Sequence, residues 1–135
     1  MSLRANAMSY HFSKKLGVPF DQAVARVTDA LKREGFGVLT DIDVSATMKA
    51  KLGEDFRPYR ILGACNPQLA HRALQLEDKI GTMLPCNVIV QQHEGGGVEV
   101  SAVDPVASMQ AIRNPGLAEV AKLVQVKLRK VVEGL

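Results

Sequence analysis

Aromatic residues are scarce in this sequence: tryptophan is absent, and the 135 residues include only two tyrosines and four phenylalanines. We therefore expect an aliphatic core, and the stacking platforms that single-stranded nucleic acid needs are poorly supplied. An excess of one charge is lacking too, because 17 basic residues face 14 acidic ones, for a net charge of +3. This mild balance indicates solubility rather than a nucleic-acid partner.

Cysteine and long apolar runs are also rare. The only cysteines, Cys65 and Cys86, are too few for a disulfide scaffold. Apolar runs such as 88–90 fall far below the roughly 20 residues that span a bilayer. No secretory segment is recognised, so we expect a cytoplasmic protein with reduced thiols and no membrane partner. Residues 1–7 are interpreted as an expression scar or a disordered segment, and residues 8–135 as a single domain.

Periodicity and turn residues predict the order of the elements. Strands are expected at 8–12, 36–44, 57–65, 86–93 and 98–103, and the second should place Phe36, Val38, Thr40, Ile42 and Val44 on one face. A helix is expected from about Pro19 to Gly35, and a short one at 45–53 with Ser45 as its cap. The glycines at 95–97 predict a hairpin turn between the last two strands.

Three further helices share one signature. Asn66-Pro67, Asp104-Pro105 and Asn114-Pro115 each place a capping side chain before a proline at the first helical position. They predict helices at 67–77, 105–111 and 115–133. The resulting order, β-α-β-β-α-β-β-α with two small helical additions, predicts an α+β fold with a largely antiparallel sheet and helices packed on one face.

Candidate reactive residues gather around one of these helices. Two Cys-Asn dipeptides, Cys65-Asn66 and Cys86-Asn87, flank the helix expected at 67–77. Capping explains Asn66, whereas Asn87 lies in a strand, where asparagine is disfavoured and its amide needs partners. If the chain returns beside its starting point after the helix, all four residues share one cleft. If the crossover instead makes the two strands parallel, the cysteines lie at opposite ends of the sheet.

Other motifs offer little chemistry. The spacing of the cysteines and histidines matches no zinc site, and His11, His71 and His93 each stand alone. The glycines at 95–97 lack the spacing of a nucleotide-binding loop. The basic run 127–130 complements the end of the last helix. The sequence therefore indicates no metal and no cofactor.

Several segments together resemble the domain of unknown function 302 family. They are 34–39, 42–44, 55–59, Ile61-Leu62-Gly63-Ala64-Cys65-Asn66-Pro67, Ile80-Gly81, Leu84-Pro85-Cys86-Asn87-Val88 and Asp104-Pro105. The resemblance covers nearly the whole chain from Met8 onward. It implies a small α+β fold of TATA-binding-protein-like architecture, found mostly in bacteria and archaea and dimeric, with no established activity.

We therefore expect a homodimeric module without known catalysis that binds a small ligand around Cys65, Asn66, Cys86 and Asn87. A one-sided sheet leaves edges or a face to cover, which also favours self-association. The alternative is a thiol- or metal-dependent enzyme that uses Cys65 and Cys86, with His71 as a further candidate. A weaker alternative is a nucleic-acid accessory protein, although we expect no nucleic acid as partner.

Overall fold

A computed structural model describes residues 9–135 of the chain. The elements follow in the order β1 (His11–Leu16), α2 (Phe20–Arg33), β2 (Gly37–Asp43), α3 (Val44–Leu52), β3 (Tyr59–Cys65), α4 (Pro67–Leu76), η1 (Ile80–Met83), β4 (Cys86–Gln92), β5 (Val98–Val103), α5 (Pro105–Ser108) and α6 (Pro115–Glu133). The interpretations of residues 1–7 and of Met8 fall outside the described residues. No helix within residues 9–135 is both long enough and apolar enough to cross a membrane.

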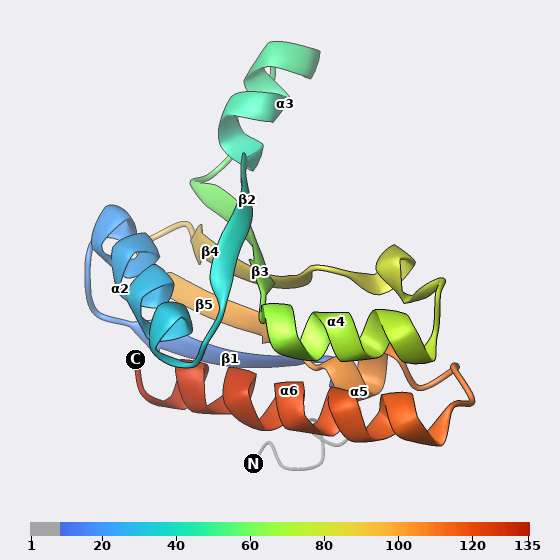
Figure 1. Ribbon diagram of the computed structural model, residues 1–135. Helices are drawn as coiled ribbons and strands as arrows, with labels where there is room; N and C mark the ends of the chain where they lie inside the picture. The colour runs from blue at the N-terminus through green and yellow to red at the C-terminus, as the bar shows by residue number, and fades with distance from the viewer. Residues whose placement is uncertain (1–8) are drawn as a thin grey trace.

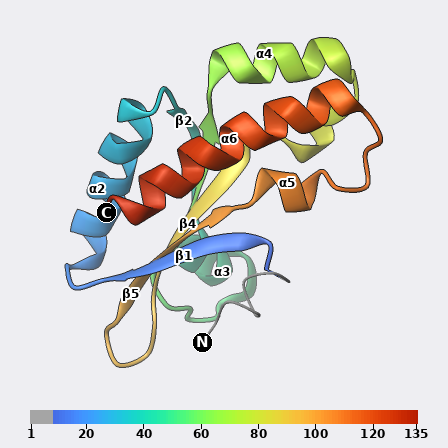
Figure 2. The same ribbon diagram turned by 90° about the horizontal axis from the view of Figure 1, so that it is seen from below.

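The five strands form one sheet in the order β1-β5-β4-β3-β2, and every neighbouring pair is antiparallel. Helices α2, α4 and α6 lie on one side of it, whereas α3 projects away from the far end of β2 (Figure 1). Seen from below, α6 crosses in front of the strands (Figure 2). The expected α+β class, antiparallel sheet and one-sided helices are confirmed.

The main apolar cluster fills the space between the sheet, α2 and α6. Alternate residues of the strands point inward, as the period of two requires, and Val88, Val90 and Val100 are fully buried there. Leu31 of α2 and Leu128 of α6 belong to the same cluster and pack against the sheet. The core is aliphatic as expected, with Phe36 as its one buried aromatic residue in the described chain.

The three cap-proline signatures are confirmed. The side-chain oxygen of Asn66 accepts a hydrogen bond from the Leu69 N–H at 3.2 Å. Asn114 does the same for the Leu117 N–H at 3.2 Å, and the Asp104 carboxylate accepts from the next helix, α5. Each cap satisfies at least one of the backbone donors that a helix start leaves free, and Asp104 accepts from both Val106 and Ala107. Helix α5 is shorter than expected and ends at Ser108.

Two local expectations at the ends of elements are wrong. Among the described residues, the first strand lies further along the chain than the expected 8–12: β1 starts at His11 and runs to Leu16, because its register with β5 extends to Val98. Ser45 does not cap α3. The Asp43 carboxylate accepts from the Ala46 N–H at 2.9 Å, so the cap lies two residues earlier than expected and the helix starts at Val44. The bounds of β1 depend on its pairing with a distant strand. The start of α3 depends on which of two neighbouring side chains caps it. Local sequence patterns predict neither.

The single apolar face expected for 36–44 is also wrong. A β-bulge shifts the register of β2 against β3 between Val38 and Thr40, so that Leu39 has no partner. One extra residue moves every later side chain to the other face. Thr40 and Ile42 therefore lie opposite Gly63 and Ile61, on the face that the main cluster does not cover.

Candidate functional site

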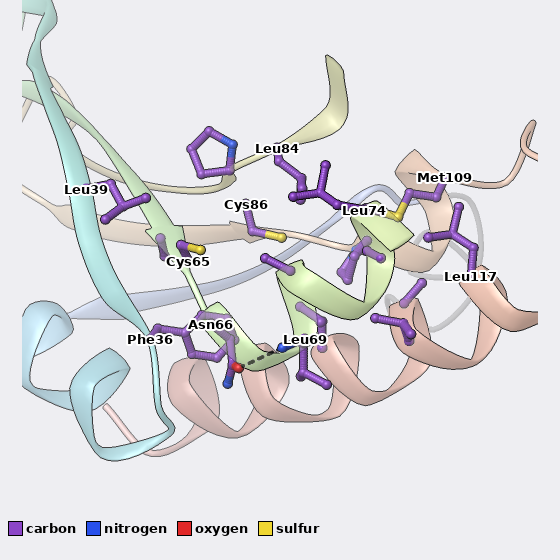
Figure 3. A pocket seen from close by; sticks show the side chains of 18 residues that line it. Phe36, Leu39, Cys65, Asn66, Leu69, Leu74, Leu84, Cys86, Met109 and Leu117 are labelled. Carbon is purple, nitrogen blue, oxygen red and sulfur yellow. Dashed lines mark hydrogen bonds between the residues drawn. The ribbon is translucent and has the colours of Figure 1, made fainter. Parts of the chain in front are cut away.

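An apolar cavity of about 270 Å³ lies where β3 ends and β4 begins, against α4, α5 and α6. Its walls come from segments far apart in the sequence (Figure 3). They are Phe36, Leu39, Ala64, Cys65, Asn66, Leu69, Ala70, Ala73, Leu74, Leu84, Pro85, Cys86, Pro105, Met109, Leu117, Val120, Ala121 and Val124. None of these side chains is charged, so the site is a lipophilic hollow whose only polar groups are one amide and two thiols.

The local sequence explains why a hollow forms at this place. Strand β3 passes directly into α4 through the Asn66 cap, so that the helix starts at the end of the sheet. Helix α4 turns Leu69 and Ala73 inward toward α6 and η1. Its inward positions include the small residues Ala70 and Ala73, which fill less volume than leucine would. Small side chains on facing helices leave the space that larger ones would occupy.

The sheet register brings the two cysteines together. Ala64 lies directly opposite Cys86 in the antiparallel β3–β4 pair. The Cα atom of Cys65 is one residue further along β3, so the Cα atoms of Cys65 and Cys86 lie roughly 6 Å apart. The parallel crossover, which would have put the cysteines at opposite ends of the sheet, is therefore wrong. Both cysteines are free.

The two thiols differ in their surroundings. Cys86 is buried, with 7% of its surface exposed, while Cys65 is half-buried. Burial, and then the nearby Cys65, raise the pKa of the Cys86 thiol to about 11. Desolvation has this sign because it penalises the charged thiolate. At neutral pH Cys86 is thus protonated and a poor nucleophile, which weakens the case for a thiol-dependent enzyme that uses it.

Asn66 is occupied by its structural task. Its side-chain oxygen caps α4, and its Nδ2 atom lies only 3.0 Å from the position that a Cβ on Gly35 would take. Gly35 has a φ of +86°, a left-handed conformation that glycine adopts without steric cost. The capping interpretation of Asn66 is confirmed, and its amide packs against the end of α2.

Asn87 does not join the other three residues. Successive residues of a strand point to opposite faces, so Cys86 faces the cavity and Asn87 faces away from the helices. Asn87 instead lines a shallow depression on the open face of the sheet, beside Tyr59, Ile89 and Ser101. The expectation of one cleft for both Cys-Asn dipeptides is therefore corrected: Cys65, Asn66 and Cys86 share the cavity without Asn87. Whether any of them binds a ligand stays a prediction.

The histidines do not contribute to the cavity. His71 is exposed and does not line it, so it cannot assist a reaction of the two thiols there. His11 lies on the open face, where its Nδ1 is 2.7 Å from the Ser13 hydroxyl. Within residues 9–135, no three or more His, Cys, Asp or Glu side chains gather where they could hold a metal ion.

Sequence reasoning missed most of the cavity wall. Leu39 belongs to it only because of the bulge in β2, and it remains 68% exposed at the rim. Met109 follows the last residue of α5, and Leu117 belongs to the first turn of α6. The only sequence signal was the repeated cap-proline motif, which fixes where α4, α5 and α6 begin but not how far apart they lie.

Comparison with known proteins agrees with this architecture. No curated protein sequence matches the chain. A crystal structure described as that of an uncharacterized conserved protein DUF302 from Bacillus stearothermophilus is 30% identical and has a TM-score of 0.85. The match covers 92% of this chain and 96% of that one. The family described as domain of unknown function DUF302 matches residues 12–135, and this chain belongs to that family.

Proposed function

We propose that this DUF302 protein is a small-ligand-binding module of one domain whose ligand is an apolar molecule held in the cavity. The observation that carries the proposal is the wall itself, which is almost wholly aliphatic and lies beside two thiols and one amide. Binding sites for small molecules are typically concave, mostly apolar and supplied with a few polar groups. Apolar cavities also stay dry and accept apolar guests.

The volume limits the size of the ligand. Each water-sized group takes about 30 Å³, so a cavity of about 270 Å³ holds roughly nine non-hydrogen atoms. The exposed rim residue Leu39 leaves a side on which a longer molecule can extend. A ligand with a net charge would find no counter-charge on the wall. We therefore favour a neutral aliphatic or aromatic compound.

Titration with two neutral probes of that size, indole and 1-octanol, tests the proposal. We expect amide chemical-shift changes in a ¹⁵N-labelled sample to concentrate on α4, α6 and the start of β4. Ala121→Leu, which fills the cavity from α6, should weaken binding at least tenfold. Ala25→Leu adds the same atoms at an exposed position on α2 and should bind like the wild type. Equal binding by both variants would refute the proposal.

We further propose that the module acts as a homodimer. The two edge strands, β1 and β2, are uncovered in the single chain, and exposed edges invite pairing with another chain. Helix α3 buries none of its residues, and Ile42 beside it is 47% exposed. A second copy is the most common cover for such surfaces. Sedimentation equilibrium at tens of micromolar should give twice 14.6 kDa, and a monomer there would end this proposal.

We also propose that the protein is cytoplasmic and that it binds neither nucleic acid nor a membrane. Support comes from the low net charge of +3 and the paucity of aromatic residues. Duplex binding that survives physiological salt, with a steep dependence on salt concentration, would contradict it.

A further inference from the structure

We propose that the open face of the sheet carries a second ligand site, which includes Asn87 and binds a neutral carbohydrate. A hollow of about 460 Å³ lies there, and it shares no lining residue with the apolar cavity. Its wall comes from β1, β3, β4 and β5. At about 30 Å³ for each water-sized group, this volume holds roughly fifteen non-hydrogen atoms, which is enough for one hexose unit.

The polar side chains of the hollow match the hydroxyl groups of a sugar. Amides and hydroxyls both donate and accept hydrogen bonds, as sugar hydroxyls do. Ser13 and Ser101 lie opposite each other in the β1–β5 pair, with their Oγ atoms 2.7 Å apart. The Nδ1 atom of His11 is 2.7 Å from the same Ser13 oxygen. Because a hydroxyl can donate one hydrogen bond and accept two, this row keeps capacity for a ligand, and the exposed Asn87 amide adds to it.

The hollow also contains the aromatic rings that a sugar site uses. The chain has only two tyrosines, and both Tyr10 and Tyr59 line the hollow. Arg57 lies over the Tyr59 ring, 5.5 Å from its centroid. Tyr10 is 70% exposed and therefore offers the more accessible ring. The C–H groups on one face of a hexose can pack on the negative face of such a ring, while its hydroxyl groups reach the polar side chains.

The charges of the hollow favour a neutral ligand. No lysine or arginine is among the described residues that line it, so an anion such as phosphate would find no strong counter-charge. Its one carboxylate belongs to Glu99, which lies 2.8 Å from the Nε2 atom of His93 and so already has a partner. An apolar ligand would remove water from the hydroxyls and amides without replacing the lost hydrogen bonds, which is costly. A neutral ligand rich in hydroxyl groups avoids both problems.

Titration of a ¹⁵N-labelled sample with the methyl glycosides of glucose, galactose, mannose and N-acetylglucosamine tests the site. We expect at least one of them to bind in the low millimolar range, with amide shifts concentrated on β1, β4 and β5. Asn87→Ala and Tyr10→Ala should each weaken that binding at least tenfold, whereas Tyr10→Phe keeps the ring and should stay within threefold. Gln22→Ala is the matched control, because it removes an exposed amide from α2, on the other side of the sheet.

Three outcomes would overturn the proposal. The first is that none of the four glycosides shifts these amides. The second is that Asn87→Ala binds as well as Gln22→Ala, which would place the sugar elsewhere, and the third is that Tyr10→Ala binds like the wild type, which would exclude stacking. If no glycoside binds and Tyr10→Ala converts a dimer into a monomer in sedimentation equilibrium, the hollow is a contact between two copies. None of these results changes the binding of indole or 1-octanol, so the two ligand sites are tested separately.

Discussion

The two apolar clusters of this protein are built from similar residues but packed differently. The cluster between the sheet, α2 and α6 joins seventeen buried residues and is dominated by valines and leucines that alternate along the strands. The cluster around α4, η1 and the first half of α6 has seven, among them Leu69, Ile80 and Leu117. Most residues of the second cluster line the cavity, whereas few residues of the first do.

This difference in packing suggests a division of roles: the sheet cluster provides stability, and the helix cluster provides the space for binding. Strands in register deliver interlocking side chains, because the pleat fixes every Cβ position. Helices α4, α5 and α6 meet without hydrogen-bonded pairing that would fix their side chains against one another. Their small residues therefore leave the cavity unfilled. We therefore expect substitutions in the sheet cluster to act on the free energy of unfolding. Substitutions in the helix cluster should act mainly on what the cavity holds.

The largest effect should follow a truncation in the sheet cluster. Leu62 is 1% exposed at the centre of β3, and Leu62→Ala should lower the free energy of unfolding by about 2–5 kcal/mol, since it removes buried methyl groups and leaves a void. Leu74→Ala, at the cavity rim with 44% exposure, should cost about 1 kcal/mol or less. Urea unfolding measures both. Equal losses would contradict the division between the sheet cluster and the rim of the cavity.

The next effect concerns pH and Cys86, which borders both regions. The folded-state pKa of its thiol is raised from 9.0 to about 11. Below pH 9 the thiol is protonated in both states and contributes nothing. As pH rises from 9 to 11 only the unfolded chain loses the proton, so the free energy of unfolding should fall, by up to about 2.7 kcal/mol.

Urea unfolding at pH 8, 9 and 10 measures this slope, and Cys86→Ala should remove most of it. Cys65→Ala is the matched control because it deletes the partly exposed neighbour. A slope that is unchanged in Cys86→Ala would show that other groups cause the alkaline loss.

A smaller effect should follow removal of the cap beside the cavity. Asn66→Ala leaves the Leu69 N–H without its acceptor and should cost about 1 kcal/mol. Asn66→Asp keeps an acceptor oxygen and should cost less. The corresponding cap of α6 has an additional role, because the Asn114 Nδ2 donates to the Leu76 carbonyl at 2.8 Å. Asn114→Ala should therefore cost more than Asn66→Ala in the same thermal unfolding experiment.

The smallest effect lies outside both clusters, at the partly exposed pair of Asp41 and Arg60. The hydrogen bond from Arg60 lowers the pKa of the Asp41 carboxyl. The stabilisation is present above the unfolded-state pKa of about 3.9 and is lost as pH falls through the folded-state value. Since solvent screens such pairs, Asp41→Asn should cost about 0.2–1 kcal/mol at pH 7. Asp41→Asn should lower the free energy of unfolding more at pH 7 than at pH 3. An equal or larger loss at pH 3 would contradict the prediction.

The sequence predicted the parts of this protein that are locally determined. The Asn-Pro and Asp-Pro motifs located three helix starts, and Gly95 and Gly96, with φ of +94° and +96°, form the expected hairpin turn. Prediction from the sequence failed where contacts with distant segments determine the local structure. Pairing with β5 set the bounds of β1, and pairing with β3 placed the bulge at Leu39.

The same contrast applies to the candidate site. The length of the connection between Cys65 and Cys86 allowed them to lie close together but left the parallel alternative open. Asn87 was assigned to the wrong side of the sheet, although strand alternation alone would have excluded it. The cavity itself had no local signal. It depends on distances between α4, α5 and α6, and no spacing within any one of these helices encodes such distances.

The bulge at Leu39 also affects how chain length can vary in this region. Val38 pairs with Ala64 and Thr40 with Gly63, so deletion of Leu39 would leave both pairs in place and close the ladder without a gap. The sheet has no need of that residue, and only the rim of the cavity uses it. Among relatives, presence or absence of a residue here would therefore report selection on the cavity separately from selection on the fold.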